Sequence, residues 1–274
     1  MAEYQCLRIE KSDGIATITI AHPPINLFDV ALMQEMGRAG QEVEADDDVR
    51  VVIVQSDDPD FFIAHADVEL ILQLPVPEPG APPRAAPNPF HAMVERFRTM
   101  PKATIGAIEG YCRGGGSEFA LSLDMRFAAL GKAVLSQPEV ALGILPGGSG
   151  TQRLPRLCGR ARALEIVLGC EDFPADLAER YGWVNRALPA DELRPFVRRL
   201  ATRIAAFPAD AIARTKAALI AGEPGWEAGL AAESNQFDQC LTNPEARRRM
   251  EAFMANGGQT REAEARDLSP LISR

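Results

Sequence analysis

The sequence predicts an α/β core followed by a largely helical C-terminal region. Up to about residue 147, short runs of β-branched and apolar residues alternate with segments whose apolar residues recur at helical spacing. This alternation is typical of strands and helices that share one sheet. Beyond Gly147 the apolar spacing becomes almost wholly helical. A chain of 274 residues can bury a sizeable core as one large domain or two small ones.

The first elements are a hairpin, a helix and a buried strand. Residues 6–9 and 15–20 carry alternating β-branched residues, and Asp13-Gly14 between them is a hairpin-turn signal. The helix that follows has Asp29 placed as its N-cap. The apolar run at 49–55 is typical of a fully buried strand, and Asp67 can cap a further short helix.

A proline-rich segment interrupts this alternation at residues 75–89. It contains seven prolines, which exclude regular structure and predict an exposed loop. The alternation then resumes with a helix over 90–99, a strand over 103–108, a glycine turn with a second helix, and a strand over 125–130. Helices are predicted over 149–157, 160–168, 174–181, 191–206, 209–221, 226–241 and 244–254, with one brief strand over 183–185.

Composition excludes several classes of function. The formal net charge of −9 argues against a nucleic-acid partner, which would need a clustered excess of Lys and Arg. The N-terminal stretch has no apolar signal region and no run is long enough for a membrane span, so we expect a cytoplasmic protein. The five cysteines lack C-x-x-C spacing, which favours reduced thiols over disulfides or a zinc site.

The most informative stretch is the glycine run Gly114-Gly115-Gly116, followed by Glu118. Three consecutive glycines indicate a backbone that turns sharply or lies against another segment with no side chain between them. The apolar residues that follow predict a helix from Ser117. The free N–H groups at such a helix start favour an anion or a developing oxyanion.

Two glutamates interrupt apolar stretches, Glu118 after the glycine run and Glu139 in the segment Ser136-Gln137-Pro138-Glu139. Most glutamates are solvated surface charges, but a half-buried carboxyl group has a raised pKa that suits general acid and base catalysis. Other chemistries lack their motifs. The glycine clusters complete no phosphate-binding loop, the three histidines show no H-x-x-x-H spacing, and no G-x-S-x-G elbow is present.

Four segments together make the chain resemble the crotonase superfamily, the enoyl-CoA hydratase/isomerase family. They are Phe62-Ile63-Ala64-His65-Ala66-Asp67, the stretch from Gly110 to Glu118, the stretch from Gln137 to Gly143 with Pro146-Gly147-Gly148, and Gly150-Thr151-Gln152-Arg153-Leu154. The resemblance implies a spiral of ββα units over residues 1–195 that holds an acyl-CoA site. It also implies a helical region over 196–274 that packs at the subunit interface of a homotrimer or a dimer of trimers.

The resemblance further implies which residues form the site. The backbone N–H groups of Ala64 and Gly115 would hold the thioester oxygen, and Glu118 and Glu139 would add water across the double bond of an enoyl-CoA. The sequence does not fix which glutamate is acid and which is base; Glu139 is favoured as the proton donor, and Glu118 as the residue that orients and activates water. The residues expected to line the substrate site are His65, Ala66, Asp67, Gly114, Leu142 and Gly147. CoA is part of the substrate, so neither a metal nor a separate cofactor is expected.

The retention of both glutamates favours hydration over the other reactions of the family. Isomerisation, decarboxylation and thioester hydrolysis remain alternatives, and so does a non-catalytic oligomeric member. His65 is the departure that bears on substrate choice, because it stands where the family usually has Gly. An imidazole there would lie close to the acyl channel or require a left-handed backbone.

Overall fold

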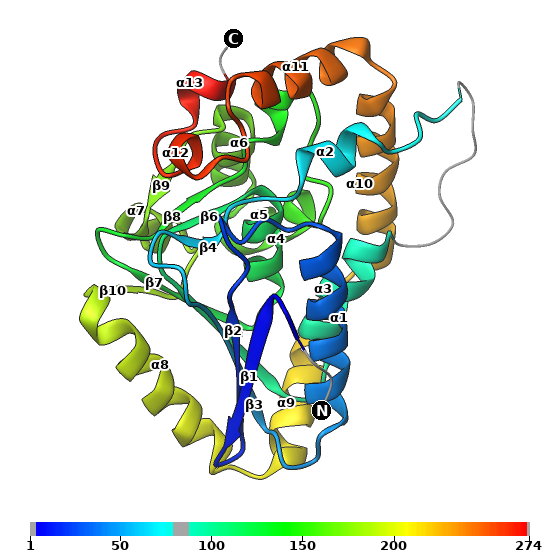
Figure 1. Cartoon of the computed structure of the whole chain (residues 1–274). Helices are drawn as coiled ribbons and strands as arrows, with labels where there is room; N and C mark the ends of the chain where they lie inside the picture. Colours follow the sequence, from blue (N-terminus) through cyan, green and yellow to red (C-terminus); the bar gives the residue numbers. More distant parts are fainter. Residues whose placement is uncertain (1–3, 79–87, 273–274) are drawn as a thin grey trace.

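The computed structural model describes residues 4–78 and 88–272, and it contains two sheets (Figure 1). The larger sheet has the order β1-β2-β3-β5-β7-β10; its strands are β1 (Leu7–Ser12), β2 (Ile15–Ile20), β3 (Val51–Ser56), β5 (Ala103–Ile108), β7 (Met125–Ala129) and β10 (Arg186–Leu188). The smaller sheet has the order β4 (Phe61–Ile63), β6 (Tyr111–Arg113), β8 (Val134–Ser136) and β9 (Phe173–Pro174). Pairing is antiparallel between β1 and β2 and between β8 and β9, and parallel elsewhere.

The chain moves between the two sheets as a spiral. Strands β3, β5 and β7 of the larger sheet are each followed by a strand of the smaller sheet, and helical structure comes next. The helical segments up to β10 are α1 (Val30–Ala45), α2 (Val68–Leu72), α3 (Pro89–Thr99), α4 (Gly114–Ser122), the 3₁₀ helix η1 (Glu139–Leu142), α5 (Gly150–Cys158), α6 (Arg160–Gly169) and α7 (Ala175–Tyr181). This arrangement confirms the predicted spiral of ββα units.

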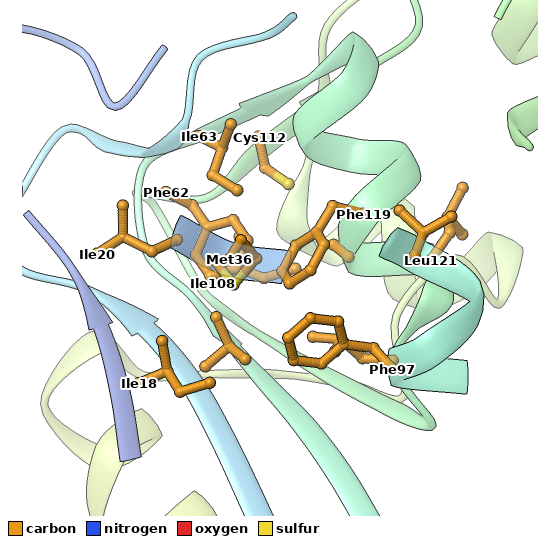
Figure 2. Packing of buried hydrophobic residues seen from close by; sticks show 14 of the residues in the cluster. Ile18, Ile20, Met36, Phe62, Ile63, Phe97, Ile108, Cys112, Phe119 and Leu121 are labelled. Carbon is orange, nitrogen blue, oxygen red and sulfur yellow. The ribbon is translucent and has the colours of Figure 1, made fainter. Parts of the chain in front are cut away.

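The main core lies between the two sheets and the helices α1, α3 and α4. Figure 2 shows Phe62, Phe97 and Phe119 from three different elements meeting at its centre. The rings of Phe97 and Phe119 pack edge to face with centroids 5.1 Å apart. Because Phe119 directly follows Glu118, this packing fixes the helix that carries the predicted catalytic carboxyl group.

The opposite face of the larger sheet is covered by α8 (Ala190–Ala205), which Figure 1 shows lying along it. Leu193, Val197 and Ala201 of this helix form a buried cluster with residues of β3, β5 and β7. The boundary expected at residue 195 falls inside this helix, which packs on the larger sheet.

The helices that follow are α9 (Ala209–Ala221), α10 (Trp226–Leu241), α11 (Pro244–Ala255), α12 (Arg261–Glu264) and α13 (Ser269–Ile272). Residues of α11 and α13, such as Phe253 and Leu271, share a buried cluster with Val68 and Leu142 of the same chain. This part of the C-terminal region thus packs on its own spiral. Its packing at a subunit interface stays a prediction.

Several local predictions are confirmed. The hairpin turn has Asp13 and Gly14 at positive φ, and the Asp29 carboxylate accepts from the N–H of Leu32 at 2.8 Å as an N-cap. Asp67 likewise caps α2 through the N–H of Glu69. The strand predicted at 183–185 is wrong, because the strand forms three residues later as β10. Most of the proline-rich segment, residues 79–87, lies outside the described residues.

No helix within residues 4–78 and 88–272 combines the length and apolar character needed to cross a bilayer.

Candidate active site

The glycine run lies where α4 meets the segment after β4. The helix begins at Gly114, three residues earlier than predicted, and no side chain caps its first amides. A Cβ at Gly115 would come within 2.9 Å of the Ala66 Cβ, and one at Gly116 within 2.4 Å of the Ile63 carbonyl oxygen. Only glycine permits this approach, so the run brings the N-terminal end of α4 directly against residues 63–66.

Glu118 is buried on α4 and is held by the start of α5. The backbone N–H groups of Gly148 and Gly150 donate to its Oε1 atom at 2.8 and 2.7 Å. Burial raises the pKa of Glu118, and the charges of Glu139 and Glu233 raise it further, while the two amide hydrogen bonds act to lower it. The net effect is a raised pKa, as expected for a buried carboxyl group that takes part in acid or base catalysis.

Glu139 is the first residue of the 3₁₀ helix η1 and is also buried. With its side-chain amide oriented to satisfy its neighbours, Gln137 donates to the Glu139 carboxyl group and accepts from the Ser117 hydroxyl at 3.1 Å. Burial raises the pKa of Glu139 to about 8. A Cβ at Gly114 would lie 2.8 Å from its Oε1 atom, so this carboxyl group reaches the glycine run.

A third buried glutamate, Glu233 on α10, was not predicted from the sequence. It accepts from the N–H groups of Ser149 at 2.6 Å and Thr151 at 3.0 Å, and from His91 Nε2 at 3.0 Å. Four consecutive amides, 148–151, are thus bound alternately by Glu118 and Glu233. Only the tertiary fold brings Glu233 here, because it lies on an ordinary helix more than 80 residues further along the chain.

The backbone N–H of Ala64, predicted to be an oxyanion-hole donor, has a partner within the chain. It donates to the Ile25 carbonyl at 3.2 Å and is therefore already engaged. The amide of Ala66 lies closer to the glycine run, since a Cβ at Gly115 would be 3.2 Å from the Ala66 nitrogen. The carbonyl of the same peptide, His65 O, accepts from Phe28 N–H at 2.9 Å. A trans peptide points its C=O and N–H in opposite directions, so the Ala66 N–H is directed away from Phe28.

The other predicted site residues fall into two groups. His65, Ala66, Gly114, Glu139 and Leu142 line one small cavity of about 30 Å³, together with Gly115 and residues of α11 and α13. Such a volume has room for a water molecule. Asp67 instead caps α2 and accepts from the Gln259 side chain at 3.1 Å, and Gly147 packs against the ring of Phe237. Those two residues therefore support the site and do not line this cavity.

A larger cavity of about 720 Å³ lies beside α9 and the C-terminal end of α4. Neither of the two catalytic candidates nor any residue of the glycine run lines it. Within the described residues, no group of three or more His, Cys, Asp or Glu side chains is arranged to hold a metal ion. Of the two candidate catalytic carboxyl groups, Glu139 lines the small cavity, and Glu118 lies behind the glycine run on α4.

Comparison with known proteins shows the family of this chain. Residues 10–260 match the family model for enoyl-CoA hydratase/isomerase. The chain belongs to this family. It is 32% identical over 248 residues to the short-chain-enoyl-CoA hydratase of Clostridium acetobutylicum, which covers 90% of this chain and 93% of that protein. It is also 32% identical over 257 residues to the crotonyl-CoA hydratase of Syntrophomonas wolfei, covering 92% and 95% of the two chains.

A solved structure extends this similarity to the fold. The crystal structure of a Streptomyces avermitilis protein, provisionally described as an enoyl-CoA hydratase, superposes with a TM-score of 0.90 at 39% identity. The match covers 99% of this chain and 98% of that chain. The similarity therefore includes the C-terminal helices that pack over the site.

Because the pKa of Glu139 is raised in the folded protein, we expect the free energy of unfolding to fall as pH rises. The folded protein retains a proton that the unfolded chain releases between about pH 4.5 and about 8, so this group contributes less to stability as pH rises through that window. We expect Glu139→Gln, which removes the ionisation, to be more stable than wild type at pH 8 by on the order of a few kcal/mol. The gain should shrink toward pH 5.

Urea unfolding across this pH range measures the effect. Glu35→Gln is a matched control, because Glu35 is also buried but accepts from the N–H groups of Gln5 and Cys6 away from the site. We expect that variant to be less stable than wild type. A Glu139→Gln protein that is no more stable than wild type at pH 8 contradicts the raised pKa.

Proposed function

We propose that the chain is an enoyl-CoA hydratase that adds water across the 2,3 double bond of an enoyl-CoA thioester. The observation that carries this proposal is the burial of two carboxyl groups, Glu118 on the helix that begins with the glycine run and Glu139 against Gly114. Hydration needs one group that accepts a proton from water and one that donates a proton to carbon. Two buried carboxyl groups with raised pKa values can share these tasks.

The oxyanion hole is proposed to consist of the N–H groups of Gly115 and Ala66. As water adds to C3, negative charge moves onto the thioester oxygen, and preorganised N–H donors stabilise that charge. Gly115 contributes an amide in the uncapped first turn of α4, where the helix adds its positive end. The amide of Ala66 is the nearest partner across the gap, and it replaces Ala64, whose N–H is bound to Ile25.

The two glutamates then act in sequence. Glu118 takes a proton from the water molecule while the water oxygen attacks C3. Glu139 donates its proton to C2 of the enolate-like intermediate. The proton that Glu118 took from water is then transferred to Glu139. One water has then been added and both carboxyl groups are back in their starting states. The amides of Gly148 and Gly150 donate to Glu118 and favour its carboxylate form, which is the reason to assign it as the base and Glu139 as the proton donor.

Substitution of either glutamate tests this mechanism. We expect Glu118→Gln and Glu139→Gln each to lower kcat for crotonyl-CoA hydration by about 10²-fold or more, since each removes a general acid or base. Loss of the conjugated thioester absorbance measures the rate, and Glu35→Gln should retain wild-type kcat. If all of these proteins hydrate equally fast, the two-glutamate mechanism is wrong.

Product identification separates hydration from the other reactions of the family. Mass spectrometry of the wild-type reaction should show the addition of one water. A product of unchanged mass would indicate isomerisation, loss of carbon dioxide would indicate decarboxylation, and free CoA would indicate thioester hydrolysis. No product of any kind would favour a non-catalytic family member.

The oxyanion hole makes a separate prediction for Gly115. An added methyl group would lie 2.9 Å from the Ala66 Cβ and would push the two amides apart. We expect Gly115→Ala to lower kcat by about 10²-fold, comparable with the loss of one oxyanion-hole donor. Gly169→Ala is the control, because a Cβ there meets no atom within 4 Å and should leave kcat unchanged. Unaltered kcat in Gly115→Ala would show that these amides do not form the hole.

We also propose a cytoplasmic homotrimer or dimer of trimers that needs no separate cofactor, as the family resemblance implies. The surface offers support for assembly, because Leu157, Phe207 and Leu219 are exposed around the 720 Å³ cavity and Leu219 is 72% exposed. Light scattering should give three or six times the 29.7 kDa chain mass. A mass of 29.7 kDa at micromolar concentration would contradict the assembly.

A further inference from the structure

His65 lies between two acceptors at the edge of the small cavity. Its Nδ1 atom is 2.7 Å from the carbonyl oxygen of Ala66, and its Nε2 atom is 2.9 Å from Oε1 of Glu264 on α12. The backbone of His65 is not among the residues with positive φ, so the ring position requires no left-handed conformation. The ring also packs edge to face against Phe253, with centroids 5.7 Å apart.

The contacts determine how many protons the ring carries. A backbone carbonyl can only accept, so the 2.7 Å contact requires a proton on Nδ1. An ionised Glu264 can also only accept, so the 2.9 Å contact requires a second proton on Nε2. Both ring nitrogens are then donors, and His65 is an imidazolium.

The surroundings support an ionised Glu264. Its Oε1 atom also accepts from the Gln259 N–H at 3.0 Å, and its Oε2 atom is 3.8 Å from the guanidinium of Arg113. Arg113 is itself paired with Asp172, to which it donates at 2.9 and 2.6 Å. The two cations of this buried network are therefore balanced by two carboxylates.

The charges act on His65 in opposite directions. Burial acts to lower the pKa of His65, but the charge and hydrogen bond of Glu264 outweigh it and the pKa is raised. Arg113 acts to lower the pKa of His65, and the positive charge of His65 acts to lower that of Glu139 across the cavity. The ring thus interacts with Glu264, Arg113 and Glu139, and Asp172 pairs with Arg113.

We propose that His65 is a positioning residue for the hydration reaction, held as an imidazolium by Glu264 so that it fixes the Ala66 peptide and places a positive charge beside the oxyanion. The Nδ1 proton anchors the carbonyl of Ala66, and the Phe28 N–H anchors the carbonyl before it. The Ala66 N–H between them is then preorganised toward the thioester oxygen. This role rests on the proposed hydratase function, but the protonation state does not.

Protonation is tested first, by NMR of the full chain labelled with ¹⁵N-histidine. The chain has three histidines, so the His65 signals can be assigned by their loss in His65→Asn. We expect both ring nitrogens of His65 to carry protons at pH 7.5. In Glu264→Gln one of these protons should be lost at that pH. A neutral imidazole in the wild-type protein overturns the proposal whether or not the protein is a hydratase.

Kinetics of the same variants tests the positioning role. In His65→Asn the side-chain amide can still donate to the Ala66 carbonyl but carries no charge, and we expect kcat to fall about 10-fold or more with little change in KM. In Glu264→Gln the pKa of His65 falls. The alkaline limb of the pH profile of kcat should therefore shift to lower pH than in wild type, and kcat should recover as pH is lowered. Glu35→Gln should match wild type in both kcat and pH profile.

Two outcomes would overturn the positioning role. One is unchanged kcat in both variants while wild type hydrates crotonyl-CoA. The other is an altered KM with unchanged kcat and pH profile, as expected if the His65–Glu264 contact only holds the C-terminal segment over the cavity. If wild type forms no hydrated product while both His65 nitrogens are protonated, the proposed function fails and the charge assignment stands.

Discussion

The site depends on burying two carboxyl groups where no cation neutralises either of them directly. Among the described residues Glu118 and Glu139 form no ion pair, and Glu118 is instead held by the amides of Gly148 and Gly150. Backbone dipoles satisfy the hydrogen-bonding needs of a carboxylate without fully lowering its pKa, so burial still dominates. A lysine or arginine side chain paired with these glutamates would instead hold both as carboxylates, and the proton donor that hydration requires would be lost.

The rest of the fold can be understood as what holds these groups in place. The spiral puts α4 against the residues after β4, and glycine at 115 and 116 is the condition for that contact. Glu233 and Glu118 together bind four successive amides at the start of α5, which ties α10 to α4. The C-terminal helices close the cavity from the other side through Phe253. The contacts that stabilise the fold here are therefore the same contacts that hold the two glutamates in place.

The sequence was most informative where chemistry demands an unusual residue. Three successive glycines and a carboxyl group inside an apolar run both indicated the site. Helices with clear helical spacing of apolar residues were predicted to within a residue or two of their ends. The smaller sheet was missed because its strands of two or three residues are too short to show a period of two. The choice between Ala64 and Ala66 could not be made either, since it depends on whether Ile25 has already bound one of the amides. Glu233 and Glu264 carry no local signal at all.

The central claim is that a carboxyl group remains protonated in this site at neutral pH. Difference infrared spectroscopy of wild type against Glu139→Gln observes this directly, because a protonated carboxyl group has a C=O stretch that a carboxylate lacks. We expect such a band in wild type at pH 7 and no such band in the variant. The wild-type band should disappear as pH rises through about 8. A wild-type spectrum at pH 7 that shows only carboxylate bands would contradict it.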